Sequence, residues 1–189
     1  IPGFGGGYIG VDVFFVISGY LITSLLINER EANDRISIRD FYARRARRLL
    51  PISVVVLAVT ALASAIWLQP TRLSALANDI MAAAAFSVNF VFAHRGTDYL
   101  QAAMEPSAIQ HYWSLAVEEQ FYMVWPGLIA LVTLGGKRIR HKIAIAMGLI
   151  VIVSFALSAT LTSATPSWAY FGLHTRAWEL GLGALLAAL

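Results

Sequence analysis

Residues 111–134 read HYWSLAVEEQFYMVWPGLIALVTL, an apolar run into which two neighbouring carboxylates, Glu118 and Glu119, are set. From residue 116 to residue 134 these glutamates are the only charges. A run of about 20 apolar residues is long enough to cross a bilayer as a helix, and charged side chains inside such a helix are rare and usually functional. The segment therefore predicts a membrane helix that carries a polar site.

The polar residues of this segment fall on one helical face. Ser114, Glu118 and Tyr122 are spaced at i, i+4 and i+8, which places them in one line along a helix, whereas Glu119 lies about 100° further round. We therefore predict catalytic roles for Ser114, Glu118 and Tyr122, with Glu118 acting as a general base, as the hydrogen-bonding partner of a base, or as a proton relay. His111, just before the helix, is the histidine nearest this stripe and is a further catalytic candidate.

Polar residues inside apolar segments also have structural interpretations. The stripe could be a buried network in which a glutamate pairs with an arginine, and Arg176 and Arg95 are the candidates. Arg176 also stands three residues before Glu179, so these two could pair with each other on one helix. Near the start of the chain, Asp12 and the Ser18–Gly19 pair interrupt an apolar run. Ser18 has no base beside it in the sequence, so the pair predicts close helix packing.

The composition indicates a membrane protein. Of 189 residues, 58% are hydrophobic and 13% are charged, against about 25% charged in soluble domains. A weaker apolar run at 75–93 is interrupted by polar residues, and another helix begins near residue 176. We predict an all-α, polytopic transmembrane helix bundle that forms one domain over residues 1–189. The four runs that approach the ~20 residues of a membrane helix are 8–27, 52–69, 116–134 and 143–165.

The same sequence excludes several kinds of site. It has no cysteine, which excludes disulfides and thiol nucleophiles, and its four histidines are scattered, so no metal site is predicted. The sequence opens on IPGFGGG without a methionine and closes on LLAAL inside an apparent helix. From these ends we expect an internal piece of a larger multi-span protein, truncated at both ends, in which the glycines of residues 3–7 form a turn.

Positive charge is concentrated in two places. Seven arginines lie between Arg30 and Arg48, and residues 137–142 add two lysines and two arginines. Short basic loops usually remain in the cytoplasm, so both should face it. An even number of membrane crossings must then separate the two clusters, yet three apolar runs, at 52–69, 75–93 and 116–134, lie between them. Whether residues 75–93 cross the membrane fully is therefore left open. Because membrane segments flank both clusters, we reject nucleic-acid binding, the other interpretation of clustered arginines.

The stretch FYARRARRLLP at residues 41–51 contains two pairs of arginines spaced three residues apart, Arg44 with Arg47 and Arg45 with Arg48. On a helix the members of each pair project together, and guanidinium groups bind phosphate oxygens through two parallel hydrogen bonds. We predict that these four arginines bind a phosphorylated ligand. The other interpretation is a membrane anchor that contacts anionic lipids.

Four segments together resemble the membrane acyltransferase-3 family, whose members transfer acyl groups to surface polysaccharides, lipopolysaccharide O-antigen or peptidoglycan. They are GYIGVDVFFVISGYLIT (7–23), FYARRARRLLP (41–51), HYWSLAVEEQFY (111–122) and TRAWELG (175–181). By analogy with the family, the resemblance implies a bundle of roughly ten helices in the intact protein. It also implies an acetyl-CoA donor on the cytoplasmic side and a glycan acceptor on the far side of the bacterial inner membrane.

Two motifs of the family can be matched residue by residue. Its R-x-x-R motif matches Arg44 and Arg47, and its S-x-x-x-E motif followed by a tyrosine matches Ser114, Glu118 and Tyr122. The family's histidine, in an arginine-x10-histidine pattern of the first membrane helix, would lie upstream of residue 1. The resemblance therefore implies that residues 1–189 alone lack the presumed catalytic base and are inactive.

These expectations define one function and one rival. The resemblance implies a membrane-bound O-acyltransferase that moves an acetyl group from acetyl-CoA to a glycan hydroxyl without a metal. The rival is a proton-coupled transporter that uses Glu118 and Glu119 as a relay. Such proteins often contain repeated discontinuous helices, and the sequence shows no repeat. The acceptor glycan, the acyl chain, the oligomeric state and the existence of an acyl-enzyme stay open at this point.

Overall fold

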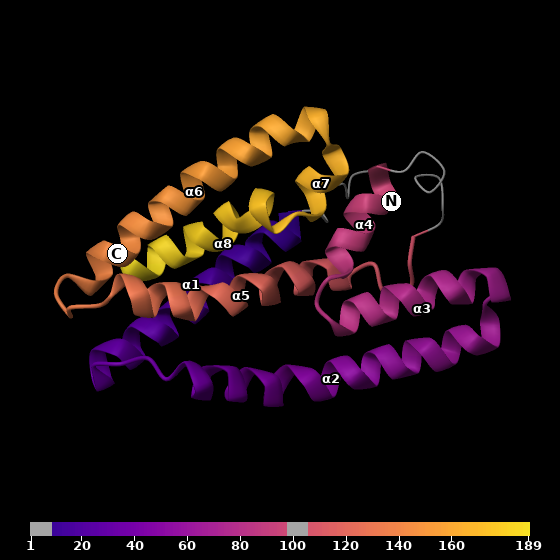
Figure 1. The fold of residues 1–189 in the computed structure, drawn as a ribbon, viewed down its shortest axis with the longest axis horizontal. Coiled ribbons are helices and arrows are strands. Elements are labelled where there is room, and N and C mark those ends of the chain that lie inside the picture. The colour runs from indigo at the N-terminus through magenta and orange to yellow at the C-terminus, as the bar shows by residue number, and fades with distance from the viewer. Residues whose placement is uncertain (1–8, 98–105) are drawn as a thin grey trace.

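The computed structural model describes residues 9–97 and 106–189, and Figure 1 shows that their regular structure is helical throughout. The predicted all-α bundle is confirmed, whereas the turn expected at residues 3–7 lies outside the described residues. In chain order the helices are α1 (Ile9–Asn33), α2 (Ile38–Trp67), α3 (Pro70–Ala84), α4 (Val88–Thr97), α5 (Tyr112–Val132), α6 (Ile139–Ala164), α7 (Pro166–Phe171) and α8 (Leu173–Ala188).

Four of these helices, α1, α2, α5 and α6, are long and apolar enough to cross a membrane. α2 begins well before the apolar run expected at 52–69 because Ser37 caps it. The Ser37 hydroxyl accepts a hydrogen bond from the Asp40 backbone N–H at 3.4 Å and donates one to the Asp40 carboxylate at 2.6 Å. Such a cap satisfies a backbone donor that the first helical turn leaves unpaired. The four arginines of residues 44–48 therefore lie on the first turns of α2, the same helix that contains the apolar run.

The weaker apolar run at residues 75–93 does not form one membrane helix. It is divided between α3 and α4 by a break at residues 85–87, where Phe86 has a φ of 51°, a left-handed conformation that bulky residues rarely adopt. The Gln120 side chain of α5 donates hydrogen bonds to the Phe86 carbonyl at 2.7 Å and to the Asn89 side chain at 2.8 Å. Backbone groups that lose their helical hydrogen bonds at such a break need other partners inside a membrane. The break is therefore stabilised by the helix that carries Glu118.

Both basic loops lie at the same end of the bundle, at the left of Figure 1. The Arg140 guanidinium at the start of α6 pairs with the Glu31 carboxylate near the end of α1, with an N–O distance of 2.8 Å. We call this the basic end and define it as residues 28–48 and 135–142. Of the four long helices, only α2 and α5 separate the two loops along the chain. This pair accounts for the even number of crossings that the charge pattern requires.

α8 lies between α1 and α6 and packs along both. Two glycines permit the close approach to α1. A Cβ atom added at Gly19 would overlap the Leu180 carbonyl, and one added at Gly183 would overlap the Val16 carbonyl. Small residues let the backbones of membrane helices come together in this way. The close packing predicted at Ser18–Gly19 is confirmed, and it holds α1 firmly against the rest of the bundle.

A side chain added at this crossing should destabilise the protein. We expect Gly183→Val to lower the unfolding temperature in detergent because it forces the α1 and α8 backbones apart, and overpacking of this kind costs about 1–3 kcal/mol. Gly148→Val on α6 is the matched control, since no described atom lies within 4 Å of the Cβ position there. Equal losses of thermal stability in the two variants would contradict the close crossing.

Candidate active site

Glu118 is the centre of a hydrogen-bonded cluster formed by α1, α2 and α5. The residue is 6% exposed. The Ser18 hydroxyl of α1 donates to its Oε1 atom at 2.6 Å, and the Tyr122 hydroxyl, one turn along α5, donates to the same atom at 2.9 Å. The Nη2 atom of Arg45, on α2, lies 3.7 Å from Oε2. Both carboxylate oxygens thus have the polar partners that a buried carboxylate requires.

One guanidinium serves two carboxylates in this cluster. Arg45 bonds the Glu119 carboxylate through two of its nitrogens, with Nε 2.7 Å from Oε1. The carbon centre of the Arg45 guanidinium lies 3.7 Å from the centroid of the Tyr122 ring. These ion-pair and cation–π contacts hold Arg45 against α5. The cluster therefore holds two carboxylates beside a single guanidinium.

The cluster lines a cavity of about 500 Å³ between α1, α2 and α5, which we call the central cavity. Arg48 forms no hydrogen bond or ion pair with any residue in the described part of the chain, so its guanidinium is available to a ligand. No group of three or more histidine, aspartate and glutamate side chains that could hold a metal lies within residues 9–97 and 106–189. The polar lining of the central cavity comprises Ser18, Arg45, Arg48, Glu118 and Tyr122, and the rest is apolar.

The two arginine pairs of α2 have different surroundings. Arg44 forms an ion pair with Glu29 of α1 at 3.0 Å, and Arg47 donates to a carbonyl of its own helix at 3.1 Å. Neither lines the central cavity. Arg45 and Arg48 have the same three-residue spacing and do line it. Of the two pairs, only Arg45 and Arg48 therefore face the central cavity, and the match of Arg44 and Arg47 to the R-x-x-R motif stays a prediction.

Two predicted site residues lie apart from the cluster. The Ser114 hydroxyl donates to the His111 carbonyl at 3.1 Å, at the start of α5, and His111 itself is exposed. Neither is among the hydrogen-bond partners that the described residues give Glu118. The serine that bonds Glu118 is Ser18, which the sequence marks only as a polar residue in an apolar helix. The two residues are 100 positions apart in the chain, so no local spacing reveals their pairing.

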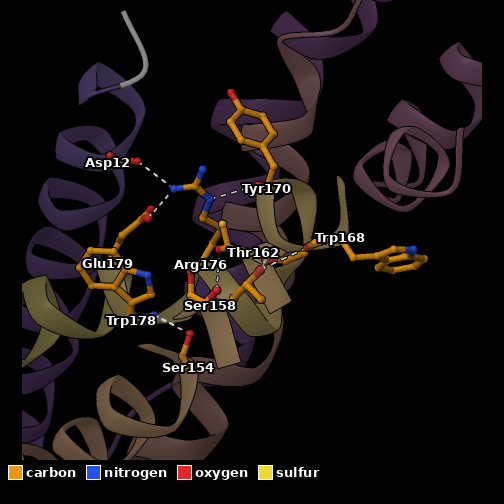
Figure 2. Close-up of polar contacts among 11 residues, drawn as sticks. Asp12, Ser154, Ser158, Thr162, Trp168, Tyr170, Arg176, Trp178 and Glu179 are labelled. Atoms are coloured by element: carbon orange, nitrogen blue, oxygen red, sulfur yellow. Dashed lines mark hydrogen bonds and ion pairs between the residues drawn. The ribbon is translucent and has the colours of Figure 1, made fainter. Parts of the chain in front are cut away.

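The arginines considered as structural partners of Glu118 pair with other carboxylates. Arg176 pairs with Glu179 at 2.6 Å, as Figure 2 shows, and the predicted i, i+3 pairing of these two residues is confirmed. Arg95 pairs with an aspartate of α3 at 2.7 Å. The arginine that completes the Glu118 network is Arg45, from the cluster predicted to bind phosphate.

The Arg176 contacts tie several helices together at the end of the bundle opposite the basic end. The Nη1 atom also bonds the Asp12 carboxylate of α1 at 3.0 Å, and Nε donates to the Tyr170 carbonyl of α7 at 3.1 Å (Figure 2). Glu179 of α8 is fully buried. These bonds and the glycine crossing together fix the position of α1, and hence of Ser18, beside α8.

The segment that contains these residues is shared with known proteins. The profile of the acyltransferase-3 family, described as an acyltransferase domain, matches residues 2–189. This chain belongs to the acyltransferase-3 family. The resemblance seen in the four sequence motifs is thereby confirmed. Membership in this family supports acyl transfer over the proton-coupled transport that the buried glutamates alone would also permit.

Several relatives of the family carry names that specify the acyl group. The chain is 37% identical over 184 residues to the peptidoglycan O-acetyltransferase OatA of Listeria monocytogenes serovar 1/2a, with 96% of this chain and 29% of that protein covered. It is 35% identical over 187 residues to the putative peptidoglycan O-acetyltransferase YrhL of Bacillus subtilis strain 168, with 96% and 29% covered. A putative O-acetyltransferase of Staphylococcus aureus strain COL is 38% identical over 187 residues, with 97% and 30% covered.

The chain therefore spans about 30% of the length of these acyltransferase-3 relatives. No solved structure matches the chain.

Proposed function

We propose that this protein is a membrane-bound O-acyltransferase that moves an acetyl group from acetyl-CoA to a hydroxyl of a cell-envelope glycan. Family membership supports acyl transfer, and the names of the relatives support an acetyl donor and a peptidoglycan acceptor. Four candidate membrane helices support a multi-pass position in the inner membrane. The observation that carries the proposal is the buried hydrogen-bonded cluster around Glu118 beside the central cavity.

The basic end is the side from which the donor enters in this proposal. Short loops rich in lysine and arginine remain in the cytoplasm, where acetyl-CoA is present as a soluble polyanion. Arg48 lines the central cavity without a partner in the described part of the chain. A guanidinium of this kind binds phosphate oxygens through two parallel hydrogen bonds. Arg48 is therefore the arginine of α2 to which we assign the donor's phosphates, while Arg45 holds the two glutamates.

Acetyl transfer from a thioester requires a proton acceptor and groups that stabilise negative charge. The glycan hydroxyl oxygen attacks the thioester carbonyl carbon, the carbon–sulfur bond breaks, and the hydroxyl proton ends on the departing CoA thiolate. Glu118 already accepts hydrogen bonds from two hydroxyl groups, and we assign it the activation of the attacking hydroxyl, a role that the family resemblance gives to a histidine upstream of residue 1. Arg45 favours the negative charge that develops on the carbonyl oxygen. Ser18 and Tyr122 keep the Glu118 carboxylate in one orientation.

Transfer of the acetyl group itself tests the proposal. Vesicles that contain the full protein are given acetyl-labelled CoA on the basic side and a soluble peptidoglycan oligosaccharide on the other. We expect label to appear in an alkali-labile ester on the glycan and free CoA to accumulate. A transporter with Glu118 and Glu119 as its relay would instead leave acetyl-CoA unconsumed and carry protons across the vesicle membrane, which would refute the proposal.

Single substitutions can show which of the two arginine pairs binds the donor. We expect Arg48→Ala to raise the KM for acetyl-CoA at least about tenfold, since hydrogen bonds to charged groups contribute roughly 1.5–3 kcal/mol. Arg48→Lys should recover only part of the loss, because an ammonium group cannot form the two parallel bonds. Arg47→Ala should raise the KM less than Arg48→Ala. The reverse order, measured by initial rates, would assign donor binding to Arg44 and Arg47.

A further inference from the structure

A second cavity lies next to the central cavity, at the basic end. This second cavity has a volume of about 610 Å³, within the ~300–1,000 Å³ of typical small-molecule pockets, and it lies where the end of α1 meets the start of α2. Asn28, Asn33, Arg35 and Arg44 contribute to its polar lining. Leu25 lines both cavities, so the two cavities are neighbours at this side chain. We call the second cavity the head-group pocket.

One guanidinium of the head-group pocket is available to a phosphorylated nucleotide. Its two carboxylates are engaged within the protein: Glu29 accepts from Arg44 at 3.0 Å and from the Ser37 backbone N–H at 2.8 Å. Asp40 accepts from the Ser37 hydroxyl at 2.6 Å. Arg35, in contrast, has no hydrogen bond or ion pair to any described residue. A free guanidinium binds phosphate oxygens, and asparagine amides such as those in this pocket match the hydrogen-bonding edge of adenine.

The separation of the two cavities suits a donor with a long arm. Asn28 in the head-group pocket lies ten positions after Ser18, which bonds Glu118, on the same helix α1, a rise of about 15 Å along the helix. Acyl-CoA has the same plan, because a phosphorylated adenosine is joined through a flexible pantetheine arm to the reactive thioester. A short acetyl donor could not occupy both cavities at once.

We infer that the head-group pocket binds the phosphorylated adenosine of the acyl-CoA donor, while the pantetheine arm passes Leu25 and brings the thioester to Glu118. This inference rests on the proposed acyl transfer. It adds Arg35, which is outside the arginine motif of α2, as a donor-binding residue. An anionic phospholipid head group has the same phosphate chemistry, so the experiment must separate the soluble donor from the lipid.

Comparison of a complete and a truncated donor tests the inference. Initial rates are measured with acetyl-CoA and with S-acetyl-pantetheine, which lacks the phosphorylated adenosine. We expect Arg35→Ala to lower kcat/KM for acetyl-CoA about tenfold, as loss of one charged hydrogen-bonding partner implies, and to leave kcat/KM for S-acetyl-pantetheine unchanged. Arg39→Ala is the matched control, because Arg39 is an exposed arginine of the basic end that lines neither cavity. It should change neither value.

Inhibition by 3′-phosphoadenosine 5′-phosphate provides a second measurement. We expect it to compete with acetyl-CoA, to bind more weakly to Arg35→Ala, and to bind normally to Leu25→Trp. Leu25→Trp should still raise the KM for acetyl-CoA, because the larger side chain would obstruct the proposed path of the pantetheine arm past residue 25.

Three results would overturn the inference. Equal losses with both donors in Arg35→Ala would give Arg35 a structural role, and an effect of Arg35→Ala that disappears in vesicles of neutral lipid would assign the pocket to phospholipid. Failure of the nucleotide to compete with acetyl-CoA would remove the pocket from the donor path. If the unmodified protein consumed no acetyl-CoA, the proposed function would fail first, and that outcome is distinct from these three.

Discussion

Arg45→Ala should abolish acetyl transfer and lower the unfolding temperature more than any other single arginine substitution on α2. The change leaves Glu118 and Glu119 buried without the cation that contacts both, and removal of one partner of a buried ion pair typically costs about 3–5 kcal/mol. Transfer rates and thermal unfolding in detergent measure the two effects. Arg45→Lys should recover little activity, because an ammonium group cannot bridge two carboxylates and stack on Tyr122 as a planar guanidinium does.

Removal of all three charges separates the structural role of the cluster from its catalytic role. We expect Arg45→Met combined with Glu118→Gln and Glu119→Gln to recover most of the stability that Arg45→Ala loses, since no buried charge is then unpaired. Transfer should stay absent in this triple variant. Arg39→Ala, at an exposed position on the same helix, should leave stability and transfer unchanged. Normal stability in Arg45→Ala would mean that the glutamates do not depend on this arginine.

Glu118→Gln should lower kcat by roughly 10²–10⁴-fold, the range that general acid–base groups contribute, with little change in the KM for acetyl-CoA. The amide keeps the shape of the side chain but cannot accept the proton of the attacking hydroxyl. Glu119→Gln should have a much smaller effect, because Glu119 lines a neighbouring, smaller cavity beside Met123, whereas Glu118 lines the central cavity. Steady-state kinetics on membranes with equal amounts of each variant measure the difference.

Two serine substitutions serve as controls for this assignment. Ser18→Ala removes a hydrogen bond to Glu118 and should lower kcat, whereas Ser114→Ala removes only a bond to a backbone carbonyl and should have a smaller effect. A larger loss in Ser114→Ala than in Ser18→Ala would restore the stripe of Ser114, Glu118 and Tyr122 on α5 as the catalytic unit. Equal losses in Glu118→Gln and Glu119→Gln would contradict the assignment of Glu118 as the catalytic carboxylate.

The helical class of the protein and its long apolar helices follow from the sequence, because hydropathy depends on residues that are close together in the chain. The positions where the helices begin and end depend also on capping and on contacts between helices. α2 starts at Ile38 because of the short-range cap at Ser37, a signal present in the sequence. The break between α3 and α4 depends instead on Gln120, which reaches the Phe86 carbonyl from another helix. The apolar run at 75–93 therefore could not be divided correctly from its own residues.

The candidate site, too, could be predicted only in part from the sequence. Glu118, Tyr122 and the arginines of α2 could be selected from the sequence, because charges and hydroxyl groups in apolar or repeated local patterns stand out without knowledge of the fold. Which arginine pair faces the central cavity could not be selected, since Arg44 with Arg47 and Arg45 with Arg48 have identical spacing. The rotation of α2 about its axis decides between them, and contacts with other helices, including its side-chain bonds to α1 and α5, set that rotation.

The sequence by itself determined that this is a helical membrane protein, that α5 carries buried carboxylates, and that its motifs are those of the acyltransferase-3 family. Each of these conclusions depends on composition or on spacing within one segment. Only the tertiary structure decided that Ser18 rather than Ser114, and Arg45 rather than Arg176, contact Glu118. The reason is physical: a hydrogen bond between two helices depends on their relative position and rotation, and the spacing of residues within one helix specifies neither.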